Sequence, residues 1–204
     1  MGESESFDRE TLAHGRATVA GDCVAVAGTL GAGPADPEPA GLCAEHEGGE
    51  PTTFGSGAAA GEDRRAFLDS VARYRDRFGL QLLHYCLMNN HFHLLVKLRD
   101  PPEASALMAG LLRAYVHQYH LRHGFLGHRW QGRFKSPAVQ CRDYLLSCGR
   151  YTERNPLEAG AVAEPWDYPW SSAPVRAKEV ANSMVTESAE YHELASEPDV
   201  RQQW

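Results

Sequence analysis

The chain has 204 residues and a mass of 22.5 kDa, with 43% hydrophobic and 23% charged residues, which excludes a fibrous or wholly disordered protein and fits one globular domain. The sequence has no run of the roughly 18 apolar residues that a membrane span needs, and its acidic start lacks the features of a signal peptide. Five cysteines form no CxxC pair. We therefore expect a soluble cytoplasmic protein with reduced thiols and no membrane partner.

The formal net charge of −7 is distributed unevenly along the chain. Residues 1–61 carry 2 basic and 10 acidic side chains, residues 62–176 carry 16 and 11, and residues 177–204 carry 2 and 6. The middle segment also holds seven of the ten histidines. We expect a low-complexity, mostly mobile segment at 1–61, a basic domain at 62–176 and an acidic tail at 177–204.

Hydrophobic periodicity and turn residues predict the elements of the domain. Val19, Val24 and Val26 indicate a short strand at residues 18–27, the only segment before residue 62 that fits one. The pattern then predicts a helix, two strands joined by Met88-Asn89-Asn90, a helix, a strand and a helix, at residues 62–78, 81–87, 91–98, 100–121, 138–141 and 142–154. The fold class is α+β, with helices packed on a ferredoxin-like antiparallel sheet whose first strand is uncertain.

Two histidines share one side of the predicted strand HFHLLVKL at residues 91–98. Because side chains alternate along a strand, His91 and His93 point to one face and an all-apolar set points to the other. Two imidazoles at this spacing can chelate one divalent cation. The alternative at this point is a pair of solvated surface histidines.

The predicted last helix carries a tyrosine and an asparagine one turn apart, Tyr151 and Asn155. Residues at i and i+4 lie on the same side of a helix, so the phenol and the amide can reach one site. Two alternatives stay open. Tyr151 can be a core tyrosine, and Asn155 can be an N-cap before Pro156 in a final turn.

The tract HRWQGRFK at residues 128–135 alternates cationic and aromatic side chains. Such a loop can neutralise phosphates and stack on the bases of a single strand. The alternative is a solvated basic loop whose rings, Trp130 and Phe134, are tucked into the core.

Four motifs in this order resemble the REP-associated branch of the single-tyrosine HUH (IS200-like) transposases. They are YCLMNNHFHLLV, RWQGRFKS, YTERNPLEAG and YPWSS, at residues 85–96, 129–136, 151–160 and 168–172. The resemblance runs from about residue 62 to residue 172. It departs from the family at Asn89, where Pro is usual, and at the amino terminus, where the family has a strand followed closely by the first helix.

The resemblance implies a DNA transposase, an endonuclease that nicks and rejoins single-stranded, hairpin-bearing DNA. By position, Tyr151 matches the nucleophile that forms a 5′-phosphotyrosyl intermediate. His91, His93 and Asn155 match the residues around Mg²⁺ or Mn²⁺. Arg129, Arg133 and Lys135 would then contact phosphates, and Trp130 would be a stacking platform.

Two further hypotheses remain beside the transposase. The first is a catalytically inactive, transposase-derived DNA-binding protein, which the unmatched amino terminus suggests. The second is a metal-dependent hydrolase unrelated to DNA, which leaves the basic aromatic tract unexplained. The sequence does not decide between a monomer and a dimer.

Overall fold

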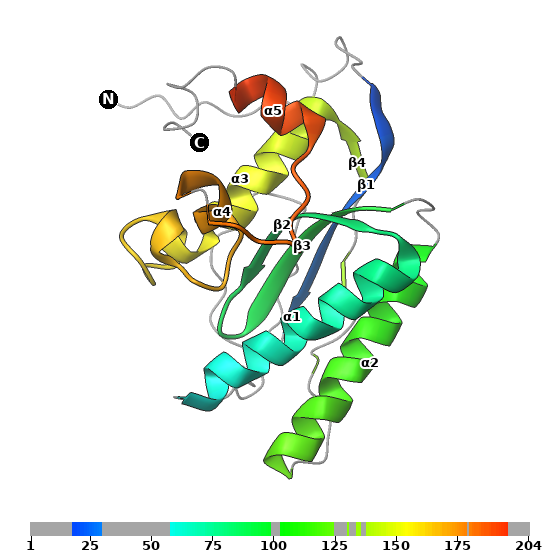
Figure 1. The fold of residues 1–204 in the computed structure, drawn as a ribbon, viewed down its shortest axis with the longest axis vertical. Coiled ribbons are helices and arrows are strands. Elements are labelled where there is room, and N and C mark those ends of the chain that lie inside the picture. The colour runs from blue at the N-terminus through cyan, green and yellow to red at the C-terminus, as the bar shows by residue number, and fades with distance from the viewer. Residues whose placement is uncertain are drawn as a thin grey trace, which may run out of the picture.

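A four-stranded antiparallel sheet forms the centre of the protein (Figure 1). The computed structural model describes residues 18–29, 58–98, 103–124, 130, 134–135, 138–178 and 180–195. The elements that build the sheet and its helical layers are, in chain order, β1 (Thr18–Thr29), α1 (Ala58–Phe78), β2 (Gln81–Leu87), β3 (His91–Lys97), α2 (Glu103–His123), β4 (Ala138–Cys141) and α3 (Arg142–Glu158). The strand order β2-β3-β1-β4 confirms the predicted ferredoxin-like α+β fold.

The first strand, which the sequence left uncertain, occupies a central position. β1 pairs with β3 from Cys23 opposite Lys97 to Thr29 opposite His91, and it pairs with β4 on its other side. The segment 1–61 therefore contributes a strand to the domain that we expected to begin at residue 62. The expectation that the domain begins at residue 62 is therefore corrected for β1, because a strand with partners on both sides belongs to the sheet.

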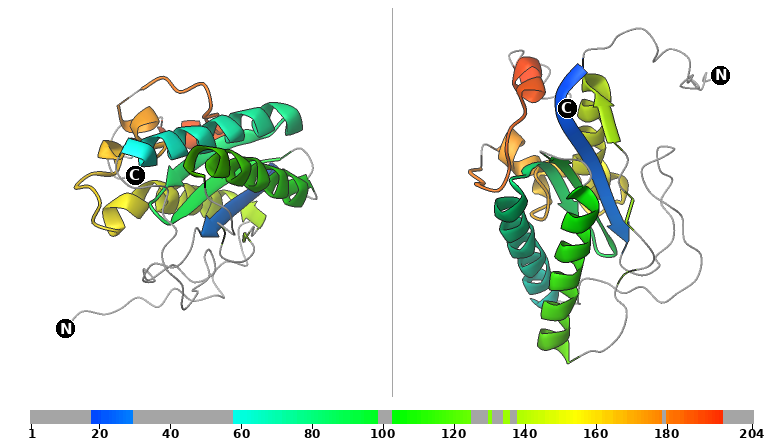
Figure 2. Two further views of the ribbon diagram at one scale, coloured as in Figure 1. Left: turned by 90° about the horizontal axis from the view of Figure 1, so that it is seen from below. Right: turned by 90° about the vertical axis from the view of Figure 1, so that its right-hand side faces the viewer.

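Helices cover both faces of the sheet (Figure 2). The face formed by Phe92, Leu94 and Val96 packs against α1 and α2, as the alternation in the sequence predicts. The other face packs against α3, with Leu95 in contact with a smaller cluster that includes Leu145. No described helix combines the length and the apolar character that a membrane crossing requires.

The last helix of the domain extends beyond its predicted end at residue 154. α3 continues to Glu158 and contains Pro156, so Asn155 is an internal residue of the helix, and the N-cap interpretation is wrong. Near a helix end the missing N–H of proline removes a single backbone bond. The next turn still closes, because the Ala159 N–H donates to the Asn155 carbonyl and Gly160 follows with a φ of 66°.

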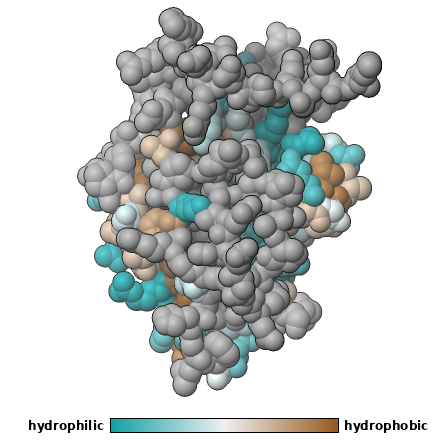
Figure 3. Space-filling view, turned by 180° about the vertical axis from the view of Figure 1, so that it is seen from behind, coloured by the Kyte–Doolittle hydropathy of each residue, from teal (hydrophilic) through white to brown (hydrophobic). Residues whose placement is uncertain are grey.

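Carboxyl-terminal segments cover the outer edge of β2. The Ser172 N–H donates to the Tyr85 carbonyl at 2.9 Å, and the Thr186 N–H donates to the Leu82 carbonyl at 2.7 Å. Ser172 lies between the short helices η2 (Pro165–Asp167) and α4 (Ala173–Ala177), and Thr186 lies between α4 and α5 (Ala189–Ala195). Part of the predicted acidic tail is thus bonded to the sheet, which protects an edge that would otherwise present unpaired backbone groups. Described residues at the sides of the rear surface are a mixture of hydrophilic and hydrophobic ones (Figure 3).

The central position of β1 gives a test of stability. Val24 lies opposite Val96 on one side and Ala138 on the other. Val24→Pro should lower the free energy of unfolding by at least about 2 kcal/mol more than Val24→Ala does, because proline removes a ladder hydrogen bond and leaves an acceptor unsatisfied. Urea denaturation followed by circular dichroism measures the difference. Equal midpoints for the two variants would contradict a central β1.

Candidate active site

Strand β3 places its two histidines on the face that α3 covers. His93 is 2% exposed and His91 is partly exposed, so the alternative of two solvated surface histidines is wrong. The register sets Ala27 of β1 opposite His93 and Thr29 opposite His91. The histidines therefore sit on a strand that is held by neighbours on both sides, where the backbone has little freedom to move.

Helix α3 brings Tyr151 and Asn155 to these histidines. Asn155 Oδ1 lies 3.0 Å from His91 Nε2. The Tyr151 ring lies edge-on to the His93 ring, with 5.4 Å between the ring centroids, and the two imidazole centroids are 5.0 Å apart. Four residues predicted from two separate motifs thus gather in one place between β3 and α3.

The His93 imidazole is kept neutral by its surroundings. Burial, together with the adjacent His91, holds the pKa of His93 well below its ordinary value of 6.5. The neutral ring is the form that binds a metal, because a ring nitrogen must offer its lone pair.

A turn residue that the sequence analysis did not single out orients the outer imidazole. Asn90 Oδ1 lies 2.8 Å from His91 Nδ1. A neutral imidazole has one N–H, so without a metal its Nε2–H can donate to Asn155 Oδ1, whereas a metal bound at Nε2 requires the tautomer whose Nδ1–H donates to Asn90 Oδ1. The only sequence signal for Asn90 was its place in the turn before the first histidine.

The donor set could hold a divalent cation. Two imidazole nitrogens and one amide oxygen would leave coordination positions for water or substrate oxygens. Among the described residues, no group of three His, Cys, Asp or Glu side chains forms an alternative metal site.

A buried charged cluster lies beside the site and was also missed. It joins Glu153 of α3 to His84, Ser172 and Arg176. Burial acts to raise the pKa of Glu153, but His84, Arg176 and Ser172 together lower it to about 2. Burial and Arg176 lower the pKa of His84, so a neutral imidazole donates to an ionised carboxylate.

Only part of the basic tract at residues 128–135 lies within the described residues. Arg129 and Arg133 lie outside the described residues, and Lys135 is partly exposed. The Trp130 ring packs against Phe67, Phe92 and Tyr115, and its indole N–H donates to the Leu112 carbonyl at 3.4 Å. This packing matches the core alternative for Trp130, while the contacts of the whole tract with DNA stay a prediction.

Comparison with known proteins gives a family match to the part of the chain that contains these residues. A family model described as "Transposase IS200 like" matches residues 57–155, which contain both histidines, Tyr151 and Asn155. Over these residues the chain is similar to the IS200-like transposase family.

The fold of the chain is also found in a solved structure. That structure is described as the REP-associated tyrosine transposase bound to a REP hairpin. The two chains share 14% identity and a TM-score of 0.57, over 86% of this chain and 94% of the other. A search of curated proteins found no match.

The bond between His91 and Asn155 can be measured in the absence of metal. In a double-mutant cycle, His91→Ala and Asn155→Ala should show a coupling free energy of about 0.5–1.5 kcal/mol, the net contribution of one hydrogen bond. Urea denaturation in a chelator gives the four values. The matched cycle of His91→Ala with Glu158→Ala, an exposed position on the same helix, should couple by less than about 0.5 kcal/mol. Equal coupling in both cycles would show that the bond does not form in solution.

Proposed function

We propose that this chain nicks and rejoins hairpin-bearing single-stranded DNA through a covalent link to Tyr151. The observation that supports this best is the convergence of Tyr151, His91, His93 and Asn155 between β3 and α3. All four lie within the residues that match the transposase family. The hairpin specificity is transferred from the structural neighbour, which is bound to a REP hairpin.

In the proposed reaction Tyr151 is the nucleophile. Its hydroxyl oxygen bonds to the scissile phosphorus while the bond from phosphorus to the 3′ oxygen breaks. The phenol loses its proton and the departing 3′ oxygen gains one, so the products are a 5′-phosphotyrosyl link and a free 3′-hydroxyl. Because the phosphodiester energy is retained in that link, the reverse attack by a 3′-hydroxyl rejoins a strand without a nucleotide cofactor.

His91, His93 and Asn155 would hold Mg²⁺ or Mn²⁺. When bound there, the ion polarises the scissile phosphate and stabilises charge on the leaving oxygen. The chain's own contribution is to present neutral imidazoles and an amide oxygen from a rigid strand and a packed helix. This placement reduces the reorganisation needed when substrate arrives.

The basic tract would contact the DNA backbone. Arg129, Arg133 and Lys135 supply cationic groups for phosphates, which give affinity without sequence information. The Trp130 ring packs against Phe92 and Tyr115. A base-stacking role for this ring, which the motif suggests, stays a prediction.

The binding-only hypothesis was based on a missing first strand. β1 occupies that position in the sheet, so the observation that favoured an inactive copy no longer supports it.

Loss of the nucleophile is the direct test of this function. The wild-type chain, incubated with Mn²⁺ and hairpin-bearing single strands, should give a covalent adduct on a denaturing gel, and Tyr151→Phe should give none. Tyr144→Phe, an exposed tyrosine on the same helix, should react like the wild type. An adduct that persists in Tyr151→Phe would reject this nucleophile, and hairpin binding without any adduct would favour the binding-only protein.

The turn before β3 provides a test of metal binding. Asn90→Ala should weaken Mn²⁺ binding about 10- to 100-fold, because the partner that orients His91 is lost. The matched control is Asn89→Ala, since the Asn89 side chain accepts a hydrogen bond from Arg64, while Asn90 is the residue beside His91 Nδ1. Electron paramagnetic resonance of free Mn²⁺ gives both affinities. Equal weakening by the two substitutions would refute a specific role for Asn90.

A further inference from the structure

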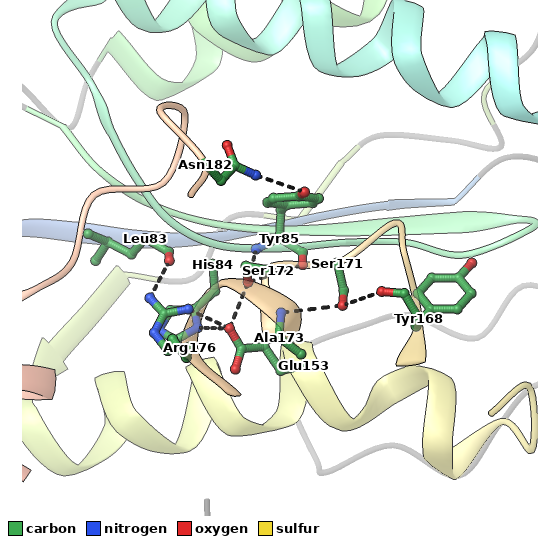
Figure 4. A network of polar contacts seen from close by, with 10 residues as sticks. All are labelled: Leu83, His84, Tyr85, Glu153, Tyr168, Ser171, Ser172, Ala173, Arg176 and Asn182. Atoms are coloured by element: carbon green, nitrogen blue, oxygen red, sulfur yellow. Dashed lines mark hydrogen bonds and ion pairs between the residues drawn. The ribbon is translucent and has the colours of Figure 1, made fainter. Parts of the chain in front are cut away.

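The carboxylate of Glu153 joins α3 to two other parts of the chain (Figure 4). Its Oε1 accepts hydrogen bonds from Arg176 Nη1 at 2.5 Å, from Ser172 Oγ at 2.7 Å and from His84 Nδ1 at 2.9 Å. The Glu153 side chain is only 4% exposed. Three donors from outside the helix thus meet on one carboxylate oxygen, in a place that water reaches poorly.

Each of the three donor residues either belongs to strand β2 or is hydrogen-bonded to it. His84 is a residue of that strand, Arg176 Nη2 donates to the Leu83 carbonyl at 2.8 Å, and the Tyr85 N–H donates to Ser172 Oγ at 3.0 Å. The carboxylate is therefore connected to three consecutive residues of β2, the strand next to the histidine strand β3.

A glycine allows the helix to approach β2 closely at the same place. Gly149 lies one turn before Glu153, and a Cβ on it would stand 2.6 Å from His84 Nε2. Any side chain at this position would push α3 or the imidazole away. Gly149 and Glu153 together make one flank of α3 rest against His84.

The opposite flank of the same helix carries the proposed active-site residues. Each helical residue advances about 100° around the axis, so Glu153 points about 200° away from Tyr151 and from Asn155. The buried face between the two flanks includes Cys148 and Thr152. One flank of α3 is thus attached to β2, and the other presents its side chains to β3.

We propose that Glu153 is a positioning residue that sets the rotation of α3 about its axis and thereby places Tyr151 and Asn155 against the histidines. This inference rests on the proposed function. A helix packed only by apolar contacts can roll by small angles, whereas a carboxylate with three fixed donors accepts one orientation. A displacement of about 1 Å at reacting groups can cost about 100-fold in rate.

The inference extends the active unit beyond the residues that match the family. Ser172 and Arg176 follow the matched stretch, which ends at residue 155. They belong to the turn and short helix that cover the edge of β2. The carboxyl-terminal segment therefore supports the geometry of the site without touching the reacting atoms.

The test compares Glu153→Gln with the wild type in the full chain. Glutamine keeps the shape but removes the charge that attracts Arg176. We expect Mn²⁺ binding, followed by electron paramagnetic resonance, to weaken about tenfold. The single-turnover rate of adduct formation at saturating Mn²⁺ should fall about 10- to 100-fold, while hairpin affinity stays unchanged. The matched control is Glu158→Gln, an exposed glutamate on α3 that should leave all three quantities unchanged.

A role in stability alone predicts a different result. Glu153→Gln would then lower the melting temperature, but Mn²⁺ affinity and rate per folded molecule, measured well below that temperature, would equal those of the wild type. That result would overturn the inference. If Glu153→Gln does not fold, Ser172→Ala removes one donor and keeps the ion pair, with Ser147→Ala on α3 as its control, and the same comparison decides.

The proposed function and the positioning role fail in different ways. A wild-type chain that binds Mn²⁺ but forms no adduct would reject the covalent mechanism. The ratio of Mn²⁺ affinities between Glu153→Gln and Glu158→Gln would still support or overturn the positioning role.

Discussion

Strand β3 is enclosed on all sides, and the rest of the site depends on that constraint. β2 and β1 bond to its two edges, α1 and α2 cover one face, and α3 covers the other. Alternation along such a strand directs every second side chain into a different layer. The His93 side chain therefore lies in the layer under α3. Burial there disfavours the protonated imidazole, so the ring stays neutral. His91 lies at the start of the strand, where it can contact the turn, the helix and a substrate.

Helix α3 has to satisfy two unlike neighbours at once. Toward β3 it offers Tyr151 and Asn155, and toward β2 it buries the Glu153 carboxylate. A buried ion pair contributes little net stability, because desolvation offsets most of the attraction. Its effect is to penalise every arrangement in which a charge loses its partner. The Glu153 cluster is thus better explained by a requirement for one geometry than by a requirement for stability.

Much of this arrangement could be predicted from local patterns. The alternation in residues 91–98 identified both faces of β3, and the i, i+4 spacing placed Tyr151 and Asn155 on one side of α3. The continuation of α3 past Pro156 could not be predicted from the sequence. How much a proline destabilises a helix depends on its distance from the helix end. The burial of Glu153 was also hidden, since a charged residue is buried only when its partners arrive from elsewhere in the chain. Those partners, His84 and Arg176, are 69 and 23 residues away.

The residues proposed to react and the segments that support them constrain the sequence differently. A metal ligand or a nucleophile must be one of a few residue types at a fixed spacing, and all four residues proposed for these roles lie in the matched range 57–155. A central strand such as β1 needs backbone partners and few particular side chains, and many sequences satisfy that need. This explains how a structure with 14% identity can share the fold over 86% of the chain. It also explains why β1 and the turn with Ser172 and Arg176 lie outside the match although the site depends on both, because packing constrains where these segments lie more than which residues they contain.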